Sequence, residues 1–195
     1  MGLPSPSPEL LRSAQQGDAA ALGRLLDQWL PTVLAWCKRL GGPTVDANDA
    51  TQDVLVLVMD RVGQVWSPSQ FRPWLFGVTR RVLARHRRGG WVKRWWGDLV
   101  GREAVDHHPG PERTAELSQT AARVQRALQS LSVAHQEVLV LCDLESRTDD
   151  EVAELLAVPS GTVKSRLRRA RAAFRTAAIR HGLGPEVERV SGGAS

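Results

Sequence analysis

The sequence has 195 residues, enough for one ordinary domain or two small ones with a buried core. Its net charge of +5 and pI near 10.2 favour a polyanionic partner, and two cysteines are too few for a disulfide framework. No apolar run approaches the length of a membrane span, and the N-terminus lacks a signal peptide's apolar core, so we expect a cytoplasmic protein without membrane insertion.

The N-terminal part of the chain shows the apolar spacing of amphipathic helices. Ser7 and Pro8 suit the start of a first helix, and Asp18 suits the N-cap of a second. Pro31 is expected either to kink this second helix or to restart it.

A third helix is expected from residue 47 to residue 65, with Asp46 as its N-cap. Its apolar stripe is expected to run from Val54 to Trp66 and to include Met59. Acidic and amide side chains on its first turns form a face that repels DNA or binds a protein: Asp46, Asp49, Gln52 and Asp53.

A fourth helix is expected from about Phe71 to Arg88, after a loop at residues 67–70. Trp74 shares helical spacing with Val78 and Val82, which favours core packing for its ring. The opposite side of this helix carries arginines, and seven basic residues lie between positions 80 and 94.

Residues 98–113 have no sustained period and contain two prolines, so we interpret them as a flexible linker. The predicted fold is all-α, with two small helical domains at residues 1–97 and 114–181 and a frayed tail at 182–195. In the second domain, Ser132 is expected to cap a helix that reaches Leu144.

The second domain ends in a helix-turn-helix pattern. Thr148 and Glu151 have the spacing of a capping box, and Pro159 predicts a turn before a last helix capped by Ser160. From Lys164 to Arg180 there are seven basic residues and no acidic one. A solvated face in an ordinary bundle usually mixes the two signs, so this helix favours DNA.

Taken together, these motifs resemble an extracytoplasmic-function sigma factor of the sigma-70 family. The segment DANDATQDVLVLVMDRV resembles the helix that grips the clamp of bacterial RNA polymerase, and FRPWLFGVTRRVLARHRR resembles the helix that melts and reads the −10 promoter element. The stretch from residue 131 to residue 175 is similar to the family's −35-reading domain. The resemblance implies promoter-specific transcription initiation with core RNA polymerase.

The resemblance also implies three sets of binding residues. Core polymerase would contact the acidic face defined above. The −10 element would contact arginines for phosphates and aromatic residues for an unstacked base: Trp66, Phe71, Arg72, Arg80, Arg81, Arg85, Arg87 and Arg88. The −35 element would contact the start and the cationic face of the last helix: Ser160, Thr162, Lys164, Ser165, Arg166, Arg168, Arg169 and Arg171.

Three features depart from the family pattern. The family often has asparagine at the position of Arg81 and aspartate at that of Arg85, so its −10 preference does not transfer. The turn often has glycine where this chain has Ala157, which predicts a less unusual backbone angle there. The segment Trp91 to Trp96 packs on the first domain, touches DNA or binds an inhibitory anti-sigma factor, in that order of preference.

The rival interpretation is a free-standing helix-turn-helix regulator that binds a palindromic site without polymerase. A pure interaction protein, such as an anti-sigma factor, would lack two cationic helices. No nucleophile motif or phosphate loop supports an enzyme, and we expect neither a cofactor nor a small-molecule substrate. His107 and His108 are adjacent in the linker and far from either cysteine in sequence, so we expect no metal site there. The expected partners are core RNA polymerase, promoter DNA and an anti-sigma factor. Binding to promoter DNA would bring the holoenzyme to the nucleoid.

Overall fold

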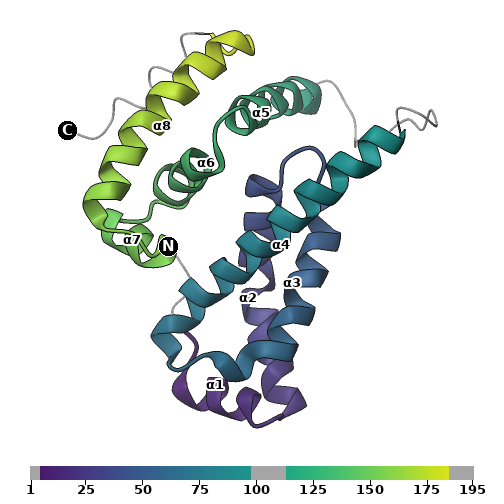
Figure 1. The fold of residues 1–195 in the computed structure, drawn as a ribbon, viewed down its shortest axis with the longest axis vertical. Helices are drawn as coiled ribbons and strands as arrows, with labels where there is room; N and C mark the ends of the chain where they lie inside the picture. Colours follow the sequence, from purple (N-terminus) through teal and green to yellow (C-terminus); the bar gives the residue numbers. More distant parts are fainter. Residues whose placement is uncertain (1–4, 98–112, 185–195) are drawn as a thin grey trace.

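The computed structural model describes residues 5–97 and 113–184, with side chains at all of these except 89–97 and 113–118. The elements of this part are helical, which confirms the all-α prediction there (Figure 1). They are α1 (Pro8–Gln15), α2 (Ala19–Leu40), α3 (Ala47–Arg61), the 3-10 turn η1 (Val62–Gln64), α4 (Pro68–Gly97), α5 (Arg113–Gln129), α6 (Val133–Leu139), the π-helical turn η2 (Val140–Leu144), α7 (Asp149–Leu156) and α8 (Ser160–Arg180).

The first two helices begin at the predicted caps. Ser7 Oγ accepts a hydrogen bond from Leu10 N at 3.2 Å, and Asp18 Oδ1 accepts one from Ala20 N at 2.9 Å. Pro31 lies inside an uninterrupted α2. The helix therefore does not restart at this proline, which was one of the two expected outcomes.

Helices α2, α3 and α4 pack together around four buried aromatic rings. Trp29 and Phe71 meet edge to face with centroids 5.3 Å apart, and Trp36 and Phe76 do the same at 4.9 Å. Such pairs add to the stabilisation from apolar burial. In Figure 1, α4 runs across α2 and α3, so this core fixes the position of the arginine-rich helix.

Two predictions for this unit are wrong in part. The apolar stripe of α3 does not include Met59 and Trp66, which are 47% and 92% exposed. Met59 lies on α3 outside the face that buries Val54 and Val58, and Trp66 follows the turn η1, because α3 ends at Arg61. Helix α4 begins at Pro68, three residues before the predicted start, because proline suits a first helical turn. Its backbone also continues as helix through the segment Trp91 to Trp96.

The C-terminal unit contains α5 to α8. A helical segment follows Ser132 as predicted, but the Ser132 side chain makes no capping hydrogen bond, and the last turn to Leu144 is π-helical. The predicted frayed tail does not begin at residue 182. Leu183 is buried and its N–H donates to the Ala178 carbonyl at 3.0 Å, because Gly182 takes a positive φ of 72°.

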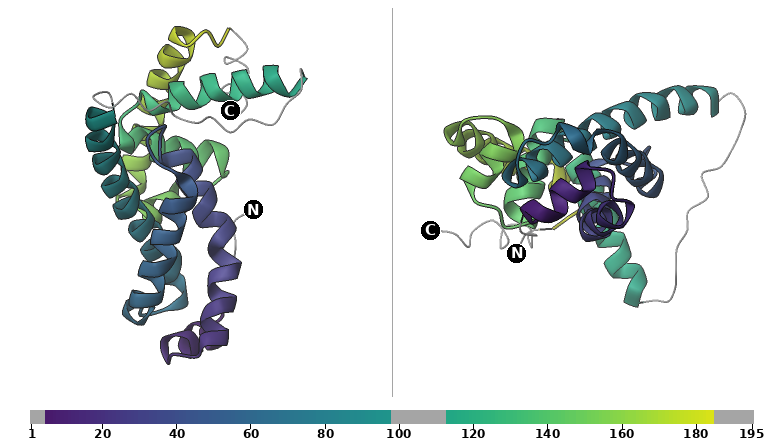
Figure 2. Two further views of the ribbon diagram at one scale, coloured as in Figure 1. Left: turned by 90° about the vertical axis from the view of Figure 1, so that its right-hand side faces the viewer. Right: turned by 90° about the horizontal axis from the view of Figure 1, so that it is seen from below.

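The two helical units pack on each other. Helix α7 lies against α4 and α6 lies against α2, and buried residues of both units form one hydrophobic cluster. Figure 2 shows the C-terminal end of α4 and the N-terminal end of α5 extending from this packed body in different directions. Nearly all of the predicted linker, residues 98–112, lies outside the described residues, so the domain boundaries there stay a prediction.

Candidate nucleic-acid and polymerase interfaces

The helix-turn-helix begins with the predicted capping box. Thr148 Oγ1 accepts from Glu151 N at 3.3 Å, and Glu151 Oε2 accepts from Thr148 N at 2.9 Å. The hydrogen bond from the Thr148 backbone holds the pKa of Glu151 below its usual range. Helix α7 then buries Val152, Leu155 and Leu156, so the whole helix is fixed against its neighbours.

The turn between α7 and α8 differs from expectation at two residues. Ala157 adopts the left-handed conformation with φ 53° and ψ 49°, which is the conformation glycine would take. The prediction of a less unusual angle is therefore wrong, and the alanine carries backbone strain. Ser160 is the first residue of α8 and not its cap, because Pro159 occupies the N-cap position.

Helix α8 presents a cationic face, on which three of the predicted −35 residues are exposed: Lys164, Arg168 and Arg169. Its opposite face buries Val163 and Leu167 against the unit. The other predicted −35 residues are half-buried: Ser160, Thr162, Ser165, Arg166 and Arg171. Such a face offers donors to phosphates and base edges without rearrangement of the unit.

Arg171 already has a partner within the unit. Its Nη2 donates to Asp143 Oδ1 at 2.6 Å and its Nε donates to Asp143 Oδ2 at 3.2 Å. This two-pronged bond raises the pKa of Arg171 and holds its guanidinium on η2. Arg171 thus differs from Arg168, which lies one turn earlier on the same face.

The two aromatic residues predicted to contact the −10 element differ in their exposure to solvent. Trp66 is 92% exposed, whereas Phe71 is 1% exposed and packs on Trp29. Phe71 therefore does not fit the predicted base-contacting role, because its ring fills the core. Arg72 also faces inward: its guanidinium lies 5.4 Å from the Trp29 ring centroid, and burial lowers its pKa.

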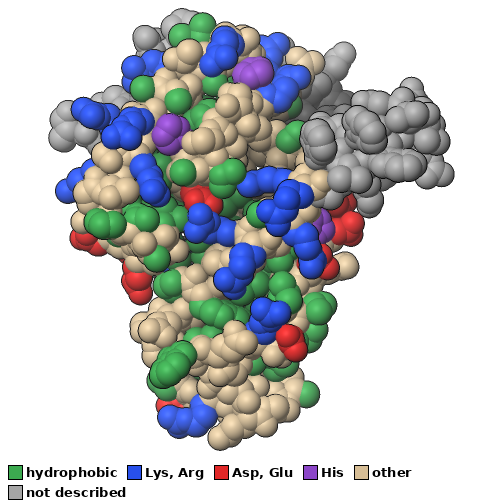
Figure 3. Space-filling model, in the orientation of Figure 1, with side chains coloured by type: hydrophobic (Ala, Val, Ile, Leu, Met, Phe, Trp, Pro, Cys, Tyr) green, Lys and Arg blue, Asp and Glu red, His purple; other side chains and the backbone are tan. Residues whose placement is uncertain are grey.

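Three of the predicted −10 arginines on α4 bind partners in the same chain, although the side chains of Arg80 and Arg85 stay 43% and 62% exposed. Arg80 Nε donates to Glu137 Oε1 at 2.6 Å, and Arg85 Nη2 donates to Asp53 Oδ2 at 2.6 Å. Arg87 donates to the backbone carbonyls of Leu40 and Gly41. Arg81 and Arg88 are exposed. In Figure 3, blue Lys and Arg side chains follow the path of α4 across the middle of the molecule.

Two residues of the predicted acidic face, Asp46 and Asp53, accept hydrogen bonds from within the chain. Asp46 caps α3 by accepting from Asn48 N at 2.8 Å and Asp49 N at 3.1 Å. His86 Nε2 lies 2.7 Å from Asp53 Oδ2, and this hydrogen bond is the main cause of the lowered pKa of Asp53. Asp49 and Gln52 are exposed, and so is Asp46, whose Oδ1 is engaged in the cap.

Within the described residues, no group of three or more His, Cys, Asp or Glu side chains is placed to hold a metal ion. His107 and His108 lie outside that part. Over the same residues, no helix combines the length and the apolar character needed to cross a membrane. The side chains of the segment Trp91 to Trp96 are not described either, so its three interpretations stay open.

Sequence comparisons match both helical units to known families. Residues 25–92 match the family described as Sigma-70 region 2, and residues 121–174 match the one described as Sigma-70, region 4. The RNA polymerase sigma factor NccH of Alcaligenes xylosoxydans xylosoxydans is 30% identical over 172 residues, 87% of this chain and 92% of NccH. The ECF RNA polymerase sigma factor SigE of Mycolicibacterium smegmatis is 32% identical over 169 residues, 85% of this chain and 65% of SigE.

The chain is an extracytoplasmic-function sigma factor of the sigma-70 family. It directs promoter-specific transcription initiation and is not an enzyme. The fold of the sigma factor agrees with solved structures. CnrH, determined in complex with the cytosolic domain of CnrY, has a TM-score of 0.62 and 25% identity, covering 88% of this chain and 96% of CnrH. RpoE of Bartonella quintana, in complex with the anti-sigma factor NepR, has a TM-score of 0.61 and 24% identity, covering 80% and 96%.

Sequence reasoning missed the acidic partner of Arg80 in the sigma factor. Glu137 is 3% exposed although it carries a carboxylate, and burial raises its pKa. The available signal was its position beside the apolar run of residues 138–142, where a charged residue needs a partner. That this partner is Arg80, 57 positions earlier in the chain, follows only from the packing of the two units.

Proposed function

We propose that α8 reads the −35 promoter element. The exposed, purely cationic row of Lys164, Arg168 and Arg169 on a helix whose other face is buried carries this proposal. Arginine binds guanine bidentately in the major groove, whereas lysine is more permissive. The half-buried Ser160, Thr162, Ser165 and Arg166 near the helix start reach adjacent phosphates.

We propose that α4 and the loop before it engage the −10 element. Trp66 offers an open ring on which an unstacked base rests, and Arg81 and Arg88 offer cations to the strand. Arg80 and Arg85 are also exposed, but they contribute only by exchanging Glu137 and Asp53 for phosphates. Arg72 and Arg87 are half-buried and contribute only after leaving their contacts with Trp29 and with backbone carbonyls. Phe71 supports this surface from the core.

We propose that α3 binds the polymerase clamp through Asp49 and Gln52, because both are exposed whereas Asp46 caps the helix and Asp53 binds Arg85. Asp46 and Asp53 contribute indirectly, as the cap of α3 and as the anchor of Arg85. An anti-sigma factor is a further proposed partner, in keeping with the complex of CnrH with CnrY. With polymerase as its partner, the sigma factor acts in the cytoplasm, on the nucleoid.

Run-off transcription with core polymerase on fragmented host DNA tests this division of labour. The sigma factor is expected to yield discrete transcripts whose start sites share asymmetric −35 and −10 elements. A free-standing regulator would instead bind a palindromic site tightly without polymerase and yield no sigma-dependent transcript. The match of the N-terminal unit to Sigma-70 region 2 favours the first outcome.

A further inference from the structure

We propose that Gln15, at the end of α1, is a positioning residue for promoter opening, because it fixes the backbone that carries Trp66 into the loop before α4. This inference rests on the proposed role of Trp66 at the −10 element. It deepens that role by identifying what holds the ring in place. Gln15 lies outside residues 25–92, the stretch that matches Sigma-70 region 2, and its proposed role involves no contact with DNA.

The Gln15 side chain bridges the two ends of the turn η1. Its Nε2 donates to the Val62 carbonyl at 3.1 Å and to the Val65 carbonyl at 2.6 Å. A side-chain amide has two N–H donors, so these two bonds use both of them. Carbonyls at the end of a helix lack partners within that helix, and here a side chain 47 and 50 positions earlier supplies the partner.

The bond to Val65 acts directly on Trp66. The Val65 carbonyl belongs to the planar peptide unit that ends at the Trp66 Cα atom, so holding its oxygen orients the backbone from which the indole ring projects. Val65 is 5% exposed, whereas Trp66 is 92% exposed. The chain therefore leaves the core at the residue whose carbonyl Gln15 binds.

The other end of the loop is held by the core. Phe71 is 1% exposed, and its ring packs on Trp29 with centroids 5.3 Å apart. Residues 66–70 therefore lie between two fixed points, one set by Gln15 and one by Phe71. A segment this short has few conformations, which lowers the entropy cost of placing Trp66 against a base.

Gln15 holds the loop because α1 is itself fixed. Leu11 and Ala14 are buried, and α1 packs on α2. Gly17 reverses the chain between the two helices with a φ of 87°, a conformation that glycine adopts without strain. In Figure 1, α1 lies at the end of the bundle where α3 ends and α4 begins. The donor and the two carbonyls thus belong to elements packed side by side.

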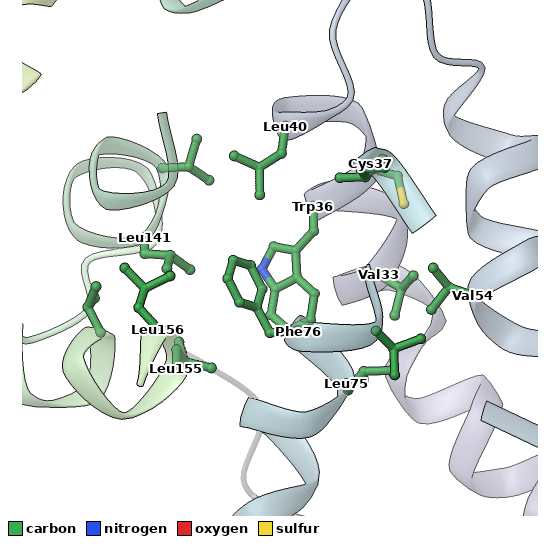
Figure 4. Close-up of a cluster of buried hydrophobic side chains, with 14 of the residues drawn as sticks. Val33, Trp36, Cys37, Leu40, Val54, Leu75, Phe76, Leu141, Leu155 and Leu156 are labelled. Atoms are coloured by element: carbon green, nitrogen blue, oxygen red, sulfur yellow. The ribbon is translucent and has the colours of Figure 1, made fainter. Parts of the chain in front are cut away.

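The core of the N-terminal unit holds both flanks of the loop without help from Gln15. Val33 of α2, Val54 of α3 and Leu75 of α4 meet in this core, and each is at most 1% exposed (Figure 4). Helix α3 leads into η1, α4 follows the loop, and both helices pack on α2. Loss of the Gln15 bonds is therefore expected to loosen the loop and to leave the bundle folded.

A matched pair of variants tests the proposal in holoenzyme, on one promoter identified by run-off transcription. Gln15→Glu keeps the length of the side chain but sets a carboxylate against the Val62 and Val65 carbonyls. It is expected to lower the equilibrium constant for opening the −10 element, measured by permanganate reactivity of thymines, by about 3- to 10-fold. Gln16→Glu makes the same change at the exposed neighbouring residue and should leave opening unchanged. Protection of the −35 element should stay at the wild-type level in both variants.

A double-mutant cycle with Trp66→Ala shows whether Gln15 acts through that ring. In the Trp66→Ala chain, Gln15→Glu is expected to have no further effect on opening, because the group that it positions is gone. Effects that multiply, or a wild-type level of opening in Gln15→Glu alone, would overturn the proposal and leave the role of Trp66 intact. Normal opening by Trp66→Ala would contradict the proposed function of Trp66 and the inference with it.

The helix content of each variant is followed by circular dichroism, which separates a misplaced loop from unfolding. If Gln15→Glu loses helix content, Gln15→Met takes its place in the cycle, because methionine keeps the length of the side chain without adding a charge. Loss of helix content in both variants, or loss of −35 protection, would overturn the proposal, because Gln15 would then support the whole unit and not the loop.

Discussion

Helices α4 and α8 both carry rows of arginines, but their surroundings differ. On α8, Arg168 and Arg169 project from a face that contains no acidic residue. On α4, three arginines are bound by partners elsewhere in the chain: Arg80 by Glu137, Arg85 by Asp53 and Arg87 by backbone carbonyls. A cationic sequence therefore does not by itself make an available DNA surface, because acceptors within the chain compete with phosphates.

The largest expected effect is the loss of core polymerase binding, on which the action of both α4 and α8 at a promoter depends. Asp49→Arg reverses an exposed charge on α3 and should abolish co-purification with core polymerase, because it sets a cation against the basic groups of the clamp. Asp27→Arg on the exposed side of α2 is the control and should co-purify normally. Normal recovery of polymerase with Asp49→Arg would remove α3 from the clamp contact.

The next effect separates the two aromatic residues at the start of α4. Phe71→Ala should lower the free energy of unfolding by about 3–5 kcal/mol, because it opens a cavity beside Trp29. Trp66→Ala should leave that free energy unchanged and weaken strand opening by holoenzyme by about 1–3 kcal/mol. Urea unfolding and permanganate reactivity of thymines measure the two effects, and equal stability losses would contradict the assignment.

A smaller effect distinguishes two arginines of α8. Arg168→Ala should weaken holoenzyme binding at the −35 element by roughly 1–3 kcal/mol if it reads a base. Arg171→Ala should cost less, because its guanidinium is already bound by Asp143. Footprints of holoenzyme titrated on one promoter measure both variants, and an unchanged −35 footprint with Arg168→Ala would exclude that residue.

The smallest effect concerns the turn that orients α8. Ala157→Gly should raise the free energy of unfolding by about 1 kcal/mol, because glycine takes the left-handed conformation without strain. Ala153→Gly, inside α7, should instead lower it by about 1 kcal/mol. Thermal unfolding measures both, and a loss of stability in Ala157→Gly would show that the alanine methyl group matters more than the strain.

Local signals in the sequence predicted most of the fold. The caps at Ser7, Asp18, Asp46 and Thr148 are all present, because capping depends on residues a few positions apart. The errors lie where tertiary contacts decide. Ala157 is held in a left-handed turn that alanine disfavours in isolation.

The site was predicted as sets of residues but not as surfaces. Helical spacing placed Phe71 next to an exposed loop, whereas its contact with Trp29 from another helix buries it. Likewise, the pairing of Arg80 with Glu137 joins two units that are far apart in sequence. Contacts of this kind depend on how the units pack, which periodicity within one helix does not report.

Footprinting of one promoter, identified by run-off transcription, tests the contrast between α4 and α8 most directly. The free sigma factor and the holoenzyme are compared by DNase protection and by permanganate reactivity of thymines. Free chain is expected to give at most weak protection at the −35 element and no reactive thymines, whereas holoenzyme protects both elements and opens the −10 element. Protection and opening of the −10 element by the free chain would contradict the pairing of the α4 arginines within the chain.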